Sequence, residues 1–409
     1  MQAIILAAGE SSRFWPLNQK HKSQIRILGK PLIYWTIKGL EENGVKDIAV
    51  VTSPQSSIEE DLKIAVRDLN VNLTFFVQEK PLGTGNAIFQ AKDFIREPFF
   101  IAWASEISIK NIAGEILNKY QQVKPQMVLV GVETSTPWEY GIFKMEDGRV
   151  VEIVENPDPG KEPSKIKTVG IYLLEPDFFN YYQNLAKHHE ADFVDALNVC
   201  LKEKKAEFVF CQKDTLSLKY PWHILSISKT MLEAESFKNY IAPSATIGEN
   251  VVIKGKVYIG ENCRIGDNNV LRGPVNLENN VKTGAFFEIK NSVVQEGTHF
   301  HSGYVGDSVI GKNCRFGAGF IVANRRIDRE NIKSVVRGKK IDTGLDYLGI
   351  TVGNNTNVGI SVSTMPGILI GPDCIVGPNS LVRENIEDSC VFYSKFEGVS
   401  KKVNCGKKS

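Results

Sequence analysis

Short apolar runs alternate with segments of helical periodicity over the first half of the chain. The runs favour strands buried on both faces of a sheet, because apolar residues follow one another without polar alternation. They lie at Ala3–Ala8, Asp47–Thr52, Leu73–Val77, Phe99–Trp103, Met127–Val132, Val150–Val154 and Val169–Leu174. The helical segments lie at Leu32–Asn43, Ile58–Leu69, Gly85–Phe94, Ile112–Gln122, Asp177–Ala186 and Phe193–Glu203.

Strands separated by helices are typical of βαβ crossovers, so residues 1–232 are predicted to form an α/β domain with a Rossmann-like, mostly parallel sheet. Val128–Val132 with Gly141–Met145, and then Val150–Val154, are expected to add an antiparallel edge.

The pattern changes after a helical segment, Ile224–Tyr240. Aliphatic residues then recur at every sixth position, at Ile241, Ile247, Ile253, Ile259, Ile265, Leu271 and Leu277. The period returns at Ile310 and Phe316, and again at Val352, Val358, Ile370 and Val376. A six-residue period is one face of a triangular β-solenoid coil, so residues 241–390 are predicted to form a parallel β-helix of hexapeptide repeats. Residues 233–240 would be a linker, Arg325–Leu348 an extruded loop and 391–409 a C-terminal tail.

Composition places the chain among ordinary globular proteins. Its 409 residues suggest two or more domains, and its net charge of +2 gives no argument for a nucleic acid or membrane partner. The seven cysteines are odd in number and form no CxxC pair. Reduced thiols without structural zinc are the simplest interpretation, and with no visible signal peptide we expect a cytoplasmic protein.

Candidate chemistry begins where the first apolar run ends. The run stops at Gly9, and a polar loop carrying Arg13 and Lys22 follows. In parallel sheets, ligands bind beyond the carboxyl ends of the strands, and glycine lets the backbone approach phosphate groups. A glycine-led loop with two cations therefore predicts a site for a phosphorylated ligand.

Several motifs together carry a family resemblance. They are LAAGESSR at 6–13, QEKPLGTG at 78–85, PWEYG at 137–141, ENP at 155–157 and TVGIY at 168–172. They resemble motifs of sugar-1-phosphate nucleotidyltransferases. With the hexad domain attached, the chain resembles the archaeal bifunctional enzymes that make UDP-N-acetylglucosamine, which join a uridylyltransferase to a left-handed β-helix acetyltransferase. The resemblance implies nucleotide binding by Leu6, Ala7, Ala8, Gly9, Gln78, Gly83 and Thr84, sugar binding by Gly141, Glu155 and Thr168, and catalysis by Arg13 and Lys22. Glu190 and Asp195 match acidic positions of the family, or are a solvated face and a helix cap.

The chain departs from the family pattern at charged and metal-binding positions. Ser11 replaces a glycine, Asn156 a lysine that contacts the sugar phosphate, and Thr168 an asparagine that contacts the sugar. Of the two aspartates that hold Mg²⁺ in the family, Glu106 replaces one and Ser217 falls at the other. A hydroxyl is a poor Mg²⁺ ligand, so Glu106 is the expected metal ligand.

The segment Thr298–Ser308 resembles the catalytic segment of the acetyltransferases, in which a histidine, then a tyrosine three residues on, precede Gly-Asp. His301 would be the general base, since a histidine can take the proton from an attacking amine near neutral pH. Tyr304 and Asn324 would hold the sugar phosphate or orient the amine. Lys333 and the basic run 337–340 would contact phosphates of the sugar or of CoA, or form a solvated loop. His299 competes with His301.

The sequence therefore predicts a bifunctional transferase of nucleotide-sugar synthesis. Its substrates would be a nucleoside triphosphate, a sugar-1-phosphate and acetyl-CoA, with Mg²⁺ as cofactor, and its assembly a homotrimer or a higher homo-oligomer. An alternative is a first domain that only senses a nucleotide, in a chain that acts as an acetyltransferase or as a scaffold subunit.

Overall fold

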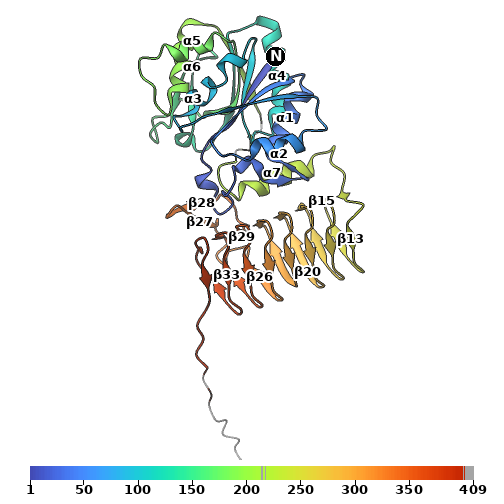
Figure 1. Cartoon of the computed structure of the whole chain (residues 1–409). Coiled ribbons are helices and arrows are strands. Elements are labelled where there is room, and N and C mark those ends of the chain that lie inside the picture. Colours follow the sequence, from blue (N-terminus) through green and yellow to red (C-terminus); the bar gives the residue numbers. More distant parts are fainter. Residues whose placement is uncertain (213–214, 217, 399, 401–409) are drawn as a thin grey trace, which may run out of the picture. The chain divides into compact units, whose positions relative to one another are not determined.

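The architecture comes from a computed structural model that describes residues 1–409 except 213–214, 217, 399 and 401–409. Contacts divide the chain into two compact units (Figure 1). One is Met1–Tyr240 with Tyr258–Gly260, and the other is Ile241–Val257 with Glu261–Ser409. Each unit is described below by itself.

In the part of the chain that the structure describes, the first unit is built on a nine-stranded sheet with the main order β11-β7-β10-β6-β1-β4-β5. Its strands are β1 (Gln2–Ala7), β4 (Asp47–Thr52), β5 (Asn72–Val77), β6 (Phe99–Trp103), β7 (Met127–Glu133), β8 (Gly141–Glu146), β9 (Arg149–Glu155), β10 (Ile166–Leu174) and β11 (Ala206–Cys211). Neighbours pair parallel except that β10 is antiparallel to β6, β7 and β8, and β8 is antiparallel to β9. The predicted Rossmann-like, mostly parallel sheet is confirmed.

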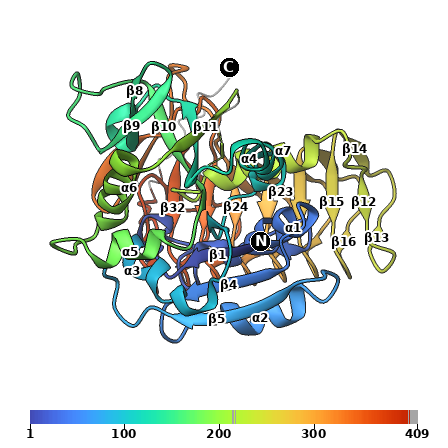
Figure 2. The same cartoon turned by 90° about the horizontal axis from the view of Figure 1, so that it is seen from above.

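Helices cover both faces of this sheet (Figures 1 and 2). Side chains of α1 (Leu32–Glu42), α2 (Ile58–Ala65) and α4 (Ile109–Val123) pack into the core on one face. Those of α3 (Thr84–Phe89), α5 (Phe178–Gln183) and α6 (Asp192–Glu203) pack on the other face. α7 (His223–Glu233) follows, and β2 (Arg26–Ile27) pairs with β3 (Lys30–Pro31).

Three details differ from the sequence prediction. Val128–Val132 lies inside the sheet between β10 and β11 and does not pair with β8, so the antiparallel edge is the β8–β9 hairpin alone. The predicted helix Gly85–Phe94 ends at Phe89, and a separate 3-10 turn follows at Lys92–Phe94. Strand β11 was missed because its residues are only partly buried at the sheet edge.

The described residues from Tyr240 onward form a parallel β-helix whose strands stack into three sheets. This β-helix makes up the second unit, except that Tyr240 and Tyr258–Gly260 are grouped with the first. The first sheet contains β12 (Tyr240–Ile241), β15 (Val257–Ile259), β18 (Val275–Leu277), β21 (Val293–Val294), β24 (Val309–Ile310), β29 (Ile350–Val352) and β32 (Ile368–Ile370). The second contains β13 (Thr246–Ile247), β16 (Arg264–Ile265), β19 (Lys282–Thr283), β22 (His299–Phe300), β25 (Arg315–Phe316), β30 (Asn357–Val358), β33 (Ile375–Val376) and β35 (Val391–Phe392). The third contains β14 (Val252–Lys254), β17 (Val270–Arg272), β20 (Phe287–Lys290), β23 (Gly303–Gly306), β26 (Phe320–Val322), β31 (Ser363–Thr364) and β34 (Leu381–Val382).

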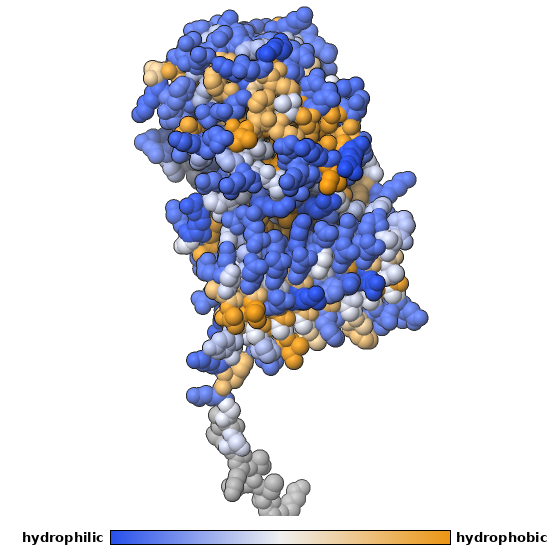
Figure 3. All heavy atoms as spheres, viewed as in Figure 1, coloured by the Kyte–Doolittle hydropathy of each residue, from blue (hydrophilic) through white to orange (hydrophobic). Residues whose placement is uncertain are grey.

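The six-residue pattern reflects how the coils stack. Inward aliphatic residues such as Ile259, Ile265 and Leu271 are almost fully buried. Outward positions are mostly polar, so the face of the β-helix turned to the viewer in Figure 3 is largely hydrophilic. Corner asparagines such as Asn262 and Asn280 adopt a positive φ, which asparagine tolerates better than most residues. The hexapeptide-repeat prediction is confirmed.

Coil length changes where the sequence period was lost. Glu261 bonds to Asn279 across an ordinary coil, 18 residues on. Between Thr298 and Cys314 the equivalent step is only 16 residues, so the hexad frame shifts there. Farther on, the predicted loop 325–348 leaves the coils between β26 and β29 and carries a hairpin of β27 (Lys333–Val336) and β28 (Lys339–Asp342).

Among the described residues, the structure has no helix with the length and apolar character to span a membrane.

Candidate functional site

A cavity of about 580 Å³ lies at the carboxyl end of β1. The predicted residues that line it are Leu6, Ala8, Gly9, Arg13, Lys22, Gln78, Gly83 and Thr84. Ala7 faces the opposite side of the strand and is buried in the core with Ala3 and Ile5, as the alternation of side chains along a strand requires. In the first motif, the strand residues Leu6 and Ala8 thus face the cavity at alternate positions. Gly9 and residues of the loop after it also line the cavity.

Gly83 forms a tight corner in this wall. Its φ is +101°, and a Cβ there would lie 2.5 Å from the carbonyl oxygen of Glu190. The amide of Gln78 donates to the Gly83 carbonyl at 3.0 Å and to Asn86 Oδ1 at 3.1 Å. These hydrogen bonds therefore fix the conformation of residues 78–83. Only glycine fits at position 83, because a side chain there would clash with Glu190.

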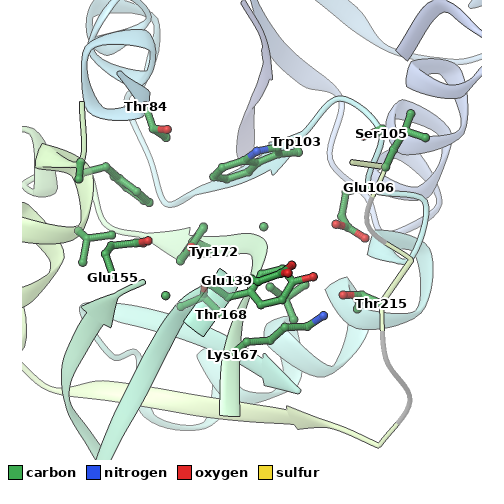
Figure 4. Close-up of a pocket in the computed structure, with 18 of the residues that line it drawn as sticks. Thr84, Trp103, Ser105, Glu106, Glu139, Glu155, Lys167, Thr168, Tyr172 and Thr215 are labelled. Atoms are coloured by element: carbon green, nitrogen blue, oxygen red, sulfur yellow. The ribbon is translucent and has the colours of Figure 1, made fainter. Parts of the chain in front are cut away.

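A second cavity of about 350 Å³ adjoins the first one. The residues that line both are Lys22, Thr84, Trp103, Ser105 and Glu190. The second cavity also brings together the predicted sugar residues Gly141, Glu155 and Thr168 and the predicted metal ligand Glu106 (Figure 4). Burial raises the pKa of Glu155. Because the two cavities share Lys22, they suit two ligands that react with each other next to this lysine.

Hydrogen bonds hold both the backbone and the side-chain ammonium of Lys22 in place. Its backbone N–H donates to Ser11 Oγ at 3.0 Å, and its ammonium donates to the Leu218 carbonyl at 2.8 Å. Burial and, to a smaller extent, the charge of Arg13 lower the pKa of Lys22 to about 8, and the charge of Glu106 acts in the opposite direction. Ser11, which replaces a family glycine, is therefore hydrogen-bonded to Lys22, the predicted catalytic lysine.

Glu106 is the predicted metal ligand, and Glu139, Glu155 and Glu190 line the same cavity. Glu106 is 6% exposed, and Ser108 Oγ donates to its Oε1. No cluster of three metal-ligating side chains occurs among the described residues. Because Mg²⁺ is often bound by one or two carboxylates together with substrate phosphates, a single buried carboxylate beside Lys22 fits the ion. Thr215 lies on the same side of the cavity in Figure 4, whereas Ser217 lies outside the described residues.

Other cavity residues were missed by the sequence analysis. Trp103, Lys167 and Tyr172 line the second cavity, although all three lie in or beside predicted strands. For Lys167, the available signal was a lysine two residues ahead of the predicted apolar strand Val169–Leu174. Asn156, in contrast, is exposed after β9 in a left-handed conformation with φ +43°.

The β-helix carries a second cluster of candidate side chains. The amide of Asn324 donates to Tyr304 Oη at 3.0 Å and to Asp307 Oδ2 at 2.5 Å. Asp307 is 2% exposed and also accepts from Lys290 at 3.0 Å and from Asn291 at 2.6 Å. Burial raises the pKa of Tyr304, and the charge of Asp307 adds to the effect. Lys290 and Asn291 were missed, although Lys290 lies opposite Gly306 in the coil register.

Two predicted residues lie apart from this hydrogen-bonded cluster. The side chain of His301 is exposed, and its backbone N–H donates to the Phe316 carbonyl at 2.9 Å. Lys333 is exposed at the start of β27. His299 lies on β22, where burial lowers its pKa and the charges of Lys282 and Arg315 lower it further. The choice between His301 and His299 as the general base therefore stays a prediction.

Comparison with protein families defines the class of protein. The nucleotidyl transferase family matches residues 2–223. A hexapeptide repeat of succinyl-transferase matches residues 256–285 and 349–383. The chain belongs to the nucleotidyl transferase family and carries a hexapeptide-repeat domain after it.

Full-length relatives make the assignment more specific. The bifunctional protein GlmU of Methanococcus maripaludis is 34% identical over 99% of this chain and 100% of its own. The bifunctional sugar-1-phosphate nucleotidylyltransferase/acetyltransferase of Sulfurisphaera tokodaii is 31% identical over 94% of this chain and 98% of its own. The chain is therefore a transferase of this bifunctional family.

A solved structure supports the fold of the first unit. The UDP-glucose pyrophosphorylase of Acinetobacter baumannii superposes with a TM-score of 0.51 and 20% identity, over 58% of this chain and 95% of that chain. At this identity the likeness shows the fold alone.

Proposed function

We propose that residues 1–232 join a sugar-1-phosphate to a nucleoside triphosphate and release pyrophosphate. UTP and N-acetylglucosamine-1-phosphate are the expected pair. The observation that carries the proposal is the pair of adjoining cavities, one lined by the nucleotide motif and the other by the sugar motifs, with Lys22 in both. The names of the full-length relatives support it.

The transfer follows from the charges at the meeting point of the cavities. An oxygen of the sugar phosphate attacks the α-phosphorus of the nucleotide, a new P–O bond forms, and the bond to pyrophosphate breaks. Negative charge grows on the departing pyrophosphate, and the cations Arg13 and Lys22 stabilise it. Glu106 would hold Mg²⁺, which supplies further charge stabilisation when bound.

We further propose that residues 241–390 transfer an acetyl group from acetyl-CoA to an amino-sugar-1-phosphate. His301 takes a proton from the sugar amine, the amine nitrogen attacks the thioester carbonyl, and the CoA thiolate leaves and is protonated. Tyr304 and Asn324, which are already hydrogen-bonded to each other, hold the sugar phosphate or orient the amine. Lys333 contacts a phosphate of the sugar or of CoA, and the chain assembles as a cytoplasmic homotrimer or higher homo-oligomer.

A second candidate function rests on charged side chains that the family pattern has and that the first unit lacks. Glu106 replaces one of the two aspartates that hold Mg²⁺ in the family, and Asn156 removes a cation at the sugar phosphate. Under this alternative the first unit binds a nucleotide without transferring it, and the chain acts as an acetyltransferase or a scaffold.

The deciding experiment measures pyrophosphate release from a panel of nucleoside triphosphates and sugar-1-phosphates. The purified full chain is assayed with Mg²⁺, with EDTA, and with or without acetyl-CoA. Release with UTP and N-acetylglucosamine-1-phosphate that EDTA abolishes supports the first function. Nucleotide binding without release over the whole panel supports the second. Thiol release with glucosamine-1-phosphate tests the acetyltransferase separately.

A further inference from the structure

The residue directly ahead of the predicted catalytic lysine has no role in the transfer proposed above. This residue, His21, lines the first cavity and also a third cavity of about 230 Å³. Its neighbour Lys22 lines the first cavity and the second. Among the described residues, the second and third cavities have no lining residue in common. His21 and Lys22 therefore lie at two different borders of the first cavity.

The third cavity is mainly polar. It lies between the loop after β1 and the loop after β4, and most of its lining side chains carry hydroxyl, amide or charged groups. Gln24 connects the two walls, because its amide donates to Ser57 Oγ at 2.9 Å and to Asp61 Oδ2 at 2.6 Å. Lys20 lines the cavity and is paired with Asp61 at 3.2 Å. Glu10 lines it too but is exposed, so water and salt screen its charge. Such a cavity suits a hydrated, hydrogen-bonding group and not an apolar one.

The hydrogen bonds of His21 indicate which ring nitrogen carries the proton. The backbone N–H of Ser23 donates to Nδ1 at 3.3 Å, and Ser23 Oγ lies 2.7 Å from the same atom. Because a backbone N–H can only donate, Nδ1 is the acceptor, and the neutral ring carries its proton on Nε2. The backbone N–H of His21 donates to Gln24 Oε1 at 3.2 Å and completes a capping box on the 3-10 turn Lys22–Gln24. The imidazole is thus held at Nδ1, and Nε2–H is its second hydrogen-bonding group.

The ring of His21 is neutral near pH 7. Burial lowers the pKa of His21 to about 3, and the charge of Lys22 contributes to the lowering. His21 is therefore a neutral donor beside the cations Arg13 and Lys22 and does not repel them. A hydrogen bond from such a donor to an ionised oxygen is stronger than one to a neutral oxygen.

The direction of the transfer indicates which part of the nucleotide lies beside His21. In phosphoryl transfer the attacking and leaving oxygens are roughly in line across the phosphorus. The sugar phosphate would approach from the second cavity, next to Lys22, so the pyrophosphate leaves on the opposite side of the α-phosphorus. His21 lines the border that the first cavity shares with the third cavity, away from the second.

We propose that the Nε2–H of His21 donates a hydrogen bond to the terminal phosphates of the nucleoside triphosphate, which leave as pyrophosphate. The inference rests on the proposed nucleotidyl transfer and adds a nucleotide-binding residue to it. Lys22 and His21 then divide the work, since Lys22 lies where the two substrates meet and His21 contacts the leaving group.

Two substitutions separate this hydrogen bond from the capping role of the same side chain. Asparagine is a good N-cap residue, so His21→Asn keeps the acceptor for Ser23 but is too short to place a donor at the Nε2 position. His21→Gln carries an amide N–H at about the reach of Nε2 and loses the cap instead. The two variants are therefore expected to have opposite effects under the two explanations.

Calorimetric titration of the full chain with UTP and with UMP, both with Mg²⁺, measures the contact without requiring turnover. We expect His21→Asn to raise the Kd for UTP about tenfold or more, as loss of one hydrogen bond to a charged group does, with the Kd for UMP within about twofold. His21→Gln should leave both values within about threefold. A melting curve of each variant confirms that it is folded in the compared samples.

Several results would overturn the proposal. They are an unchanged Kd for UTP in His21→Asn, equal weakening of UTP and UMP, a loss in His21→Gln as large as in His21→Asn, or UTP binding no tighter than UMP binding in the unaltered chain. A loss in His21→Gln alone would assign His21 to capping the turn. Pyrophosphate release is measured in parallel. Weaker UTP binding in His21→Asn without release by any of the proteins would refute the proposed transfer and support the hydrogen bond.

Discussion

The two candidate sites are assembled from the sequence in different ways. In the α/β unit, the ammonium of Lys22 reaches a carbonyl 196 residues later. In the β-helix, Lys290 reaches Asp307 only 17 residues later, and Asn324 reaches Tyr304 over 20 residues. The first site draws on loops at the ends of several strands, whereas the second draws on neighbouring coils.

This difference affects how each site tolerates substitution. A cavity walled by many segments can receive a lost charge from another strand. A coil repeats in register, so the neighbours of a side chain are fixed by the residues one coil before and after it. The β-helix site should therefore be sensitive to single changes, and the α/β site should show partial, separable losses.

The largest effect is expected at the proposed base of the β-helix. His301→Ala should lower acetyl transfer about 10²–10⁴-fold, the usual contribution of general base catalysis, and should leave pyrophosphate release unchanged. The measurement is thiol release from acetyl-CoA with glucosamine-1-phosphate. His299→Ala is the matched control on the same coil. A large loss in His299→Ala with little change in His301→Ala would move the role to His299.

A smaller loss is expected at the corner of the nucleotide cavity. Gly83→Ala places a Cβ at positive φ and 2.5 Å from the Glu190 carbonyl oxygen. Positive φ alone costs about 1–2 kcal/mol, so kcat/KM for the nucleoside triphosphate should fall about tenfold or more. Gly148→Ala is the control, since Gly148 also has positive φ but an added Cβ there meets no atom within 4 Å. Equal kinetics in both variants would show that the corner does not shape the cavity.

Sequence periodicity predicted the fold well wherever neighbours along the chain decide the structure. The hexads predicted the β-helix, and the apolar runs predicted most strands of the sheet. The failures have non-local causes. β11 is a partly buried edge strand, the pairing partner of Val128–Val132 lies far along the chain, and the coils around His301 are shortened.

The candidate site was predictable only where a motif marked it. The predicted nucleotide-binding and sugar-binding residues line the cavities, except Ala7, which is turned to the core. Lys167 and Lys290 belong to no recognised motif, and their places depend on which strands pair across the fold. Composition and spacing along one chain do not contain that information.

A pH profile tests whether Lys22 acts through its charge. Because burial holds the pKa of Lys22 near 8, the ammonium is present below that pH and is lost as the pH rises through it. For the free enzyme, kcat/KM for the nucleoside triphosphate should therefore fall above pH 8, approaching tenfold per pH unit. Lys22→Arg keeps its charge at these pH values and should remove the decline, whatever its absolute rate. A decline of the same midpoint in Lys22→Arg would assign the titration to another group.

The smallest effect is expected at Ser11, which replaces the family glycine and contacts Lys22, the predicted catalytic lysine. Ser11→Ala removes the acceptor for the Lys22 backbone N–H, which lies 3.0 Å away. One such hydrogen bond contributes about 0.5–1.5 kcal/mol, so pyrophosphate release should fall about two- to tenfold. Acetyl transfer in the same protein should stay constant. Ser12→Ala, one residue on in the 3-10 turn Ser12–Phe14, controls for loss of a hydroxyl nearby. If Ser11→Ala and Ser12→Ala have the same rates, the hydroxyl of Ser11 does not position Lys22, and the serine is merely tolerated in the loop.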